Sequence, residues 1–178
     1  MQITQGYYDP QPLIDLYQRT FTASDGADEG AVIGDLVKHL LSDTAAQDIH
    51  VLQGQIDGAP IAAAIFTRLT FPDDPHHVVI LSPMAVAPDH QRKGHGQALL
   101  RQALDALAKD GVQVAITYGD PAYYGQVGFA PLTTDQAQPP LPLSMPIGWI
   151  GQPLKEATMP TLIGPSRCVR ALNRPEIW

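Results

Sequence analysis

The feature that most constrains the fold of this chain is a strand, a glycine-containing turn, a helix and a second strand in direct succession. The run "HHVVILSPMAV" (76–86) predicts a buried strand, the apolar residues of 94–110 recur at helical spacing, and "VQVAITY" (112–118) is typical of another buried strand. Gly111 follows the helix where a C-cap glycine belongs. Since a helix connects them, the strands at 78–87 and 112–118 are expected to be parallel, in an α/β fold.

Upstream of this unit, helical spacing covers 10–21 and 29–43, and a short edge strand is expected at 1–8. The second helix carries one apolar stripe, formed by Val32, Ile33, Leu36, Val37, Leu40 and Leu41. The runs "DIHVLQGQI" (48–56) and "IAAAIFTRLTF" (61–71) read as strands that lead into 76–86. Together the three strands predict an antiparallel meander.

The region after 131 is less regular. The run "PLTTDQAQPPLPLSMP" (131–146) contains five prolines and predicts an ordered loop or a substrate-facing lip. The segments 148–157 and 159–172 are expected to be two closing strands. With 178 residues, no internal repeat and no long linker, the chain is expected to form one domain over 1–178.

Composition excludes several classes of protein. The formal net charge of −7 disfavours nucleic-acid binding and suits a cationic or amine substrate. No apolar run reaches the roughly 20 residues of a membrane span, and no signal peptide is visible at the start, so a cytoplasmic protein is expected. Cys168 is the only cysteine and is interpreted as a buried structural residue.

The turn "QRKGHG" (91–96) carries the strongest chemical signal. Gly94 and Gly96 remove side chains just before a helix, whose first N–H groups and positive dipole end attract anions. Neither glycine is followed by lysine, which excludes a P-loop, and Leu99 stands where a dinucleotide fingerprint needs a third small residue. A diphosphate remains a candidate ligand, and a tight turn with packing value only is the alternative.

Two sequence motifs that occur in the same order as in a known protein family make a resemblance to that family specific. The run "QRKGHGQA" (91–98) after "PMAV" resembles the Gln/Arg-x-x-Gly-x-Gly/Ala acetyl-CoA motif of the GNAT superfamily of N-acetyltransferases. The run "YYGQVGF" (123–129) resembles the family's Tyr-x-x-x-Gly-Phe element. The longer "GDPAYYGQVGFAPL" resembles a bacterial subgroup of predicted acetyltransferases. The resemblance is specific over 78–131 and general in pattern over 1–77. After residue 131 it is weak.

The resemblance implies a GNAT fold: a mixed central sheet of six to seven strands with about four helices, splayed between 78–87 and 112–118. It implies that Met84, Ala85 and Val86 contact the pantetheine arm of acetyl-CoA through their main chain, with the Met84 amide facing the thioester oxygen. Tyr124 would be the general acid for the leaving thiolate, and Met84 and Tyr124 the catalytic residues. The diphosphate would be bound by Gln91, Arg92, Lys93, Gly94, His95, Gly96 and Gln97.

The general base has no assignment. Many relatives carry a glutamate on the strand, four residues before the position of Met84, and this chain has Ile80 there. A water relay or an amine that binds neutral would serve instead. The other polar candidates on or before the strand are Asp73, Asp74, His76, His77 and Ser82.

The expected function is therefore acetyl transfer from acetyl-CoA to a primary amine of a small molecule, with no metal. Retention of Tyr124 favours catalysis, because a protein that only binds CoA needs no proton donor. The alternatives are a non-catalytic CoA-binding module of the same fold, a protein or peptide amine as acceptor, an alcohol acceptor, or a longer acyl group. A homodimer is compatible with the resemblance.

Overall fold

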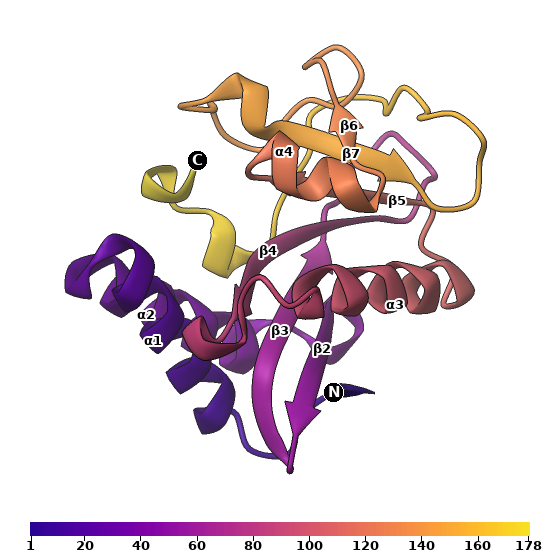
Figure 1. Cartoon of the computed structure of the whole chain (residues 1–178). Helices are drawn as coiled ribbons and strands as arrows, with labels where there is room; N and C mark the ends of the chain where they lie inside the picture. Colours follow the sequence, from indigo (N-terminus) through magenta and orange to yellow (C-terminus); the bar gives the residue numbers. More distant parts are fainter. The chain divides into compact units, whose positions relative to one another are not determined.

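The computed structural model describes the whole chain, residues 1–178, as a mixed sheet with four α-helices (Figure 1). The helices are α1 (Gln11–Asp25), α2 (Ala27–Asp43), α3 (His95–Lys109) and α4 (Pro121–Tyr124). The strands are β1 (Gln2–Gln5), β2 (Ile49–Ile56), β3 (Ala59–Arg68), β4 (Val78–Val86), β5 (Val114–Tyr118), β6 (Ala130–Pro131) and β7 (Trp149–Pro153). The seven strands follow the hydrogen-bonded order β1-β2-β3-β4-β5-β7-β6, which confirms the predicted α/β fold.

The chain divides into two compact units, which are described separately. Unit 1 consists of residues 1–66 and 83–103, and unit 2 of residues 67–82 and 104–178. Strand β4 and helix α3 each contribute residues to both units. The expectation of a single domain over 1–178 stays a prediction.

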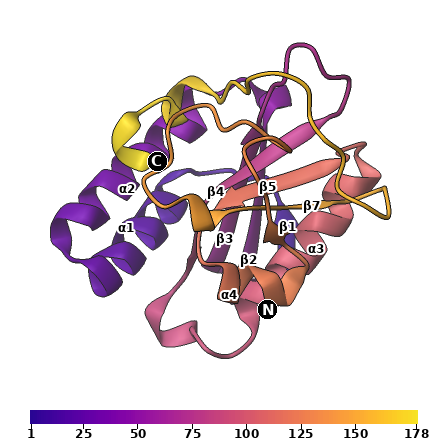
Figure 2. The same ribbon diagram turned by 90° about the horizontal axis from the view of Figure 1, so that it is seen from above.

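In unit 1, helices α1 and α2 pack side by side, as Figures 1 and 2 both show. Gly26, with a φ of 100°, is the only residue between them, whereas helical spacing in the sequence left residues 22–28 between the two predicted helices. On α2, Gly30 permits close packing, because a Cβ there would lie 2.8 Å from the carbonyl oxygen of Gln18. The stripe predicted on α2 is partly wrong: Leu36, Val37 and Leu40 are buried, whereas Val32 is 44% exposed. Because α2 packs closely against α1 through Gly30, Val32 is turned toward solvent.

The strands of unit 1 lie close to their predicted places. Strand β1 pairs with β2 in antiparallel register at the edge of the sheet, as expected. Strands β2 and β3 are joined by Asp57 and Gly58, both with positive φ, which is typical of a two-residue hairpin turn. Residues 62–66 of β3 are fully buried because they run through the centre of the sheet.

In unit 2, the first half of β4 pairs in parallel with β5, which confirms the parallel arrangement expected from the strand–helix–strand unit. On its other side β5 pairs with β7 in antiparallel register, and Figure 2 shows the two strands side by side. Strand β7 confirms the first predicted closing strand. The second, at 159–172, is wrong: only isolated bridges form there, between Thr70 and Arg167 and between Gln138 and Pro165. Prolines in this segment remove the donors that a ladder needs.

Candidate active site

The turn after β4 is held by its own side chains. A short 3₁₀ helix, η2 (Pro88–His90), follows the strand. The Gln91 side chain then donates through Nε2 to the carbonyl oxygen of Val86 at 3.0 Å. The Lys93 ammonium donates to the carbonyl oxygen of Asp89 at 2.7 Å. The two bonds hold the shape of the turn. The second one places the Lys93 ammonium against the main chain of Asp89.

The main chain of this turn leaves a row of N–H groups without acceptors in the chain. Arg92 has a φ of 57° and Gly94 a φ of 79°, so two residues with positive φ flank Lys93 just before α3 begins at His95. Within residues 92–96, no amide donates to a backbone oxygen. A non-glycine residue with positive φ is uncommon and often marks a functional segment. Successive N–H groups without acceptors at a helix start are a donor set that suits an anion, and the helix dipole adds positive potential.

The surroundings of the turn favour a bulky anion. Arg92 is exposed and forms no salt bridge. A Cβ at Gly94 would meet no atom within 4 Å, so the approach to the amides is open. The His95 ring lies 6.0 Å from the ring of His90. A phosphate group fits this donor set, which offers several N–H groups and one free guanidinium.

The second half of β4 leads into the turn. Register pairs with β5 run from Val78 to Leu81, one residue short of the end of β5, while β4 continues to Val86. Pro83 has no N–H, so it cannot extend a ladder. Its carbonyl oxygen instead accepts from the buried Tyr17 hydroxyl at 3.0 Å. The segment expected to contact pantetheine, Met84 to Val86, thus extends past the last β5 pair and alternates between half-buried and buried residues.

Tyr124 belongs to unit 2 and lies at the end of α4. The Asp120 carboxylate caps this helix by accepting from the Ala122 amide at 2.8 Å, and Pro121 occupies the first helical position. The Tyr124 ring makes edge contacts with Tyr123 at 5.1 Å and with Phe129 at 5.7 Å between centroids. The three aromatic residues of the motif "YYGQVGF" therefore form one cluster, with the Tyr124 ring between the other two.

The environment of the Tyr124 hydroxyl keeps it protonated. Burial raises the pKa of Tyr124 well above its usual value of 10.0, and the neighbouring Tyr123 and Asp120 add to the rise. A side-chain hydrogen bond with Thr117 acts in the opposite direction. The phenol is therefore protonated at physiological pH.

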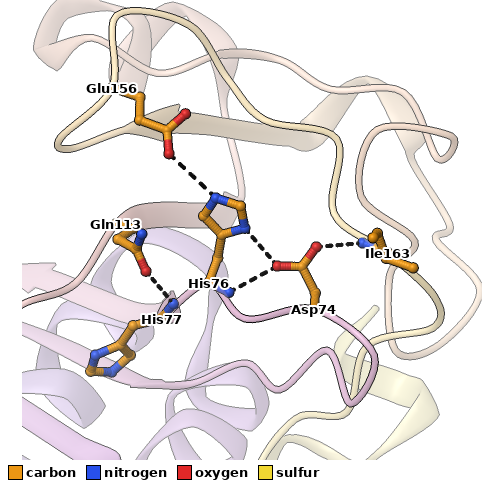
Figure 3. Close-up of polar contacts among 6 residues, drawn as sticks. All are labelled: Asp74, His76, His77, Gln113, Glu156 and Ile163. Carbon is orange, nitrogen blue, oxygen red and sulfur yellow. Dashed lines mark hydrogen bonds and ion pairs between the residues drawn. The ribbon is translucent and has the colours of Figure 1, made fainter.

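The polar residues before β4 form a structural cluster (Figure 3). The Asp74 carboxylate accepts from the His76 amide at 2.9 Å, from the His76 ring at 2.6 Å and from the Ile163 amide at 2.8 Å. Glu156 lies 3.3 Å from the other ring nitrogen of His76. Only an imidazolium carries two ring N–H donors, so the cluster selects the charged form of His76.

The pKa values of this cluster agree with its geometry. The hydrogen bond with Asp74 raises the pKa of His76 above 6.5, against desolvation and with help from Glu156. For Asp74, desolvation would raise the pKa, but the two backbone N–H groups and His76 together lower it below 3.8. A histidine held as a cation is a poor general base, so the cluster ties two loops together instead. Ile80 lies buried in the sheet, in register with Ile116, and offers no replacement.

Three features of unit 2 were not predicted from the sequence. Helix α4 was not predicted because it has only four residues, although Asp120-Pro121 is a recognisable helix start. Thr117 was read only as part of a buried strand, and its hydrogen bond to the carbonyl oxygen of Leu81 was not expected. Gly119 was not singled out, yet a Cβ at this position would lie 2.6 Å from Cε2 of Tyr124. Nothing local to Gly119 indicates this contact, because Tyr124 lies further along the chain.

Comparison with known proteins agrees with this geometry. Residues 11–129 match the family model of the acetyltransferase (GNAT) family. The chain is also 34% identical over 139 residues to the uncharacterized N-acetyltransferase YjhQ of Escherichia coli K12, an alignment covering 75% of this chain and 76% of that protein. This chain belongs to the GNAT family and is an acyltransferase.

Solved structures show the same fold. The GNAT family N-acetyltransferase YhbS of Escherichia coli, in complex with CoA, superposes with a TM-score of 0.82 at 21% identity, over 97% of this chain and 92% of that one. An aminoglycoside 6′-N-acetyltransferase complexed with coenzyme A gives a TM-score of 0.62 at 11% identity, over 89% and 99%. At these identities the likeness concerns the fold alone.

None of the helices has the length and apolar character needed to cross a membrane. The cytoplasmic location and the homodimer stay predictions.

Proposed function

We propose that this acyltransferase transfers an acetyl group from acetyl-CoA to a primary amine of a small molecule. The observation that carries the proposal is the row of amide N–H groups at 92–96, within a GNAT motif and at the start of a long helix. CoA in the YhbS complex and in the aminoglycoside acetyltransferase complex supports the choice of donor.

The residues that would bind the donor lie on one continuous stretch of unit 1. The diphosphate would be bound by the main chain of Gln91, Arg92, Lys93, Gly94, His95 and Gly96, with Gln97 beside it. Arg92 would add positive potential, since the Lys93 ammonium is already engaged with Asp89. Met84, Ala85 and Val86 would contact the pantetheine arm. Acetyl-CoA itself supplies an activated thioester, and the Met84 amide would stabilise charge on its carbonyl oxygen.

Tyr124 would protonate the leaving thiolate. A phenol is a weaker acid than a thiol, so it stays protonated until the C–S bond breaks. Burial raises the pKa of Tyr124 and so makes proton transfer to the thiolate less favourable, whereas the interaction with Thr117 acts against that rise. The acceptor amine would bind neutral or lose its proton to water, since no carboxylate takes the place of Ile80.

A small cationic amine is the acceptor class that we infer. The net charge of −7 favours cations over anionic partners, and one structural neighbour is an aminoglycoside acetyltransferase. The test is a comparison of kcat/KM for a panel of small polyamines and aminoglycosides with that for lysine-containing and N-terminal peptides. We expect the small amines to be preferred at least about tenfold. A preference for peptides would overturn the acceptor class and leave acetyl transfer intact.

A further inference from the structure

Tyr17 is a buried polar side chain on the inward face of α1. It lies among Leu13, Leu16 and Thr20, which recur at helical spacing and are buried as well, and it is 0% exposed. A hydroxyl removed from water costs free energy unless it is hydrogen-bonded. The Tyr17 hydroxyl donates to the carbonyl oxygen of Pro83 at 3.0 Å. Helix α1 thus places a proton donor against the main chain of β4.

Pro83 is a residue whose main chain offers only its carbonyl. Proline has no N–H, and Pro83 is buried, so the carbonyl oxygen is the one backbone group of this residue that needs a partner. Pro83 lies beyond Leu81, where the register pairs with β5 end. A side chain of α1, and not β5, therefore supplies a donor at this point of the strand.

The bond to Pro83 also fixes the direction of the next amide. The carbonyl of Pro83 and the N–H of Met84 belong to one planar peptide group, and in a trans peptide they point in opposite directions. Since the carbonyl points toward Tyr17, the Met84 N–H points away from α1. Rotation of this peptide group would break the bond, which holds the N–H in its direction. The bond also polarises the peptide group, which makes its N–H a better donor.

We propose that Tyr17 is a positioning residue: its hydroxyl holds the peptide group between Pro83 and Met84 so that the Met84 N–H faces the thioester oxygen of acetyl-CoA. This inference rests on the proposed function, in which that amide stabilises charge on the carbonyl oxygen. All three residues belong to unit 1. Tyr17 acts on the reaction only through the main chain of β4.

The step that Tyr17 would assist is the attack of the amine. The amine nitrogen bonds to the carbonyl carbon, and the π electrons of the C=O bond move to oxygen, where the Met84 N–H hydrogen-bonds to the negative charge. The C=O bond then re-forms as the C–S bond breaks with its electron pair on sulfur. The sulfur takes one proton from the general acid, which regains one from solvent, and the nitrogen releases one to solvent. Tyr17 keeps its own proton, so atoms and charges balance.

The test is Tyr17→Phe, which keeps the ring and removes only the hydroxyl. We expect kcat to fall about tenfold, which is part of the loss that follows removal of a whole oxyanion donor. The Kd of CoA should stay unchanged, because CoA has no acyl carbonyl for the Met84 amide to contact.

A spectroscopic measurement reports on the amide directly. A hydrogen bond to the thioester oxygen lowers the C=O stretching frequency, which isotope-edited infrared spectra of acetyl-CoA labelled at this carbon can detect. With acetyl-CoA bound and no amine present, the wild type should show this lowering and Tyr17→Phe a smaller one. Excess acetyl-CoA stabilises the folded state by binding, so the spectrum can be recorded even if Tyr17→Phe is less stable.

Thr20→Val is the matched control. Thr20 lies three residues after Tyr17 on the same face of α1, is 7% exposed, and donates to the carbonyl oxygen of Val86 at 3.5 Å. That oxygen also accepts from the Gln91 side chain at 3.0 Å, so it keeps a donor in the variant. Both kcat and the carbonyl frequency should therefore stay at wild-type values. Thermal unfolding checks that each variant folds.

The outcomes separate the two proposals. Wild-type kcat or an unchanged carbonyl frequency in Tyr17→Phe would overturn the role of Tyr17 and leave acetyl transfer standing. A Kd of CoA that rises as kcat falls, or an equal loss in Thr20→Val, would also overturn it, because β4 would then be loosened as a whole. If the wild type acetylates no amine, the proposed function itself is overturned, and this inference with it.

Discussion

The turn at 91–96 and the surroundings of Tyr124 are the two proposed functional regions, and they are built in different ways. The turn offers main-chain N–H groups, and its geometry depends on positive φ at Arg92 and Gly94. The Tyr124 region depends on side chains and on one missing side chain, from residues that are not adjacent in the sequence. A site made of main chain imposes glycines at fixed spacing, whereas a site made of side-chain contacts leaves no such pattern.

The largest expected effect tests the side-chain region. Replacement of Tyr124 with phenylalanine removes only the hydroxyl, since the ring contacts with Tyr123 and Phe129 are kept. We expect kcat to fall about a hundredfold or more, because a general acid contributes at least that much. Steady-state kinetics of thiol release measure it. Tyr123→Phe is the control and should keep most of the activity; equal losses in both variants would mean that neither phenol is the specific donor.

The main-chain region is tested by adding a negative charge at its centre. In Gly94→Asp the carboxylate would stand at the expected diphosphate position, and we expect the Kd of CoA to rise about tenfold or more through charge repulsion. Calorimetric titration with CoA measures it.

Gly58→Asp is the matched control for that variant. Gly58 and Gly94 share a φ of 79°, and a Cβ at either position would meet no atom within 4 Å, so both substitutions carry the same backbone strain. Gly58 lies in the β2–β3 turn, away from the motif. Unchanged affinity in Gly94→Asp, or an equal loss in Gly58→Asp, would contradict the assignment of the diphosphate site.

A smaller effect is expected from crowding the Tyr124 ring. The Cβ of Gly119→Ala would press on the ring, and we expect kcat to fall about tenfold while the Kd of CoA stays constant. Gly125→Ala introduces the same methyl group into open space and should leave kcat unchanged. Wild-type kcat in both variants would show that the position of the ring is not critical.

The smallest effect concerns stability and pH. The raised pKa of His76 contributes stability that is complete below 6.5 and is lost as the pH rises through the folded-state pKa. The lowered pKa of Asp74 contributes stability that is lost only as the pH falls below 3.8 and through its folded-state pKa. His76→Gln should therefore cost about 1.5 kcal/mol near pH 6 and less near pH 9, measured by urea unfolding. A cost that does not change with pH would contradict an imidazolium in the cluster.

The contrast between the two regions also explains which elements could be predicted from the sequence. The strand–helix–strand unit at 78–118 was found correctly, because its elements are long and periodic and Gly111 ends the helix. The segment 159–172 was predicted wrongly, since its extended residues meet single partners such as Thr70 instead of a neighbouring strand. Val32 was placed on a buried stripe because apolar character alone does not reveal that Gly30 brings α2 so close to α1.

Within the candidate site, too, features with a local sequence pattern could be predicted and contacts between distant residues could not. The turn at 91–96 could be recognised because its glycines, its position before a helix and the motif agree. The contact between Gly119 and the Tyr124 ring could not, because Tyr124 lies beyond a helix start. The missing carboxylate at Ile80 was visible in the sequence, and the structure adds that Ile80 is buried in register with Ile116.

The most direct test of the account is the stoichiometry of one reaction. Purified protein is incubated with acetyl-CoA and a small cationic amine, and free CoA and acetylated amine are quantified together by mass spectrometry. The account predicts that the two products form in equal amounts and that both depend on the amine. Release of CoA without an acetylated amine, or no reaction with any amine, would contradict it.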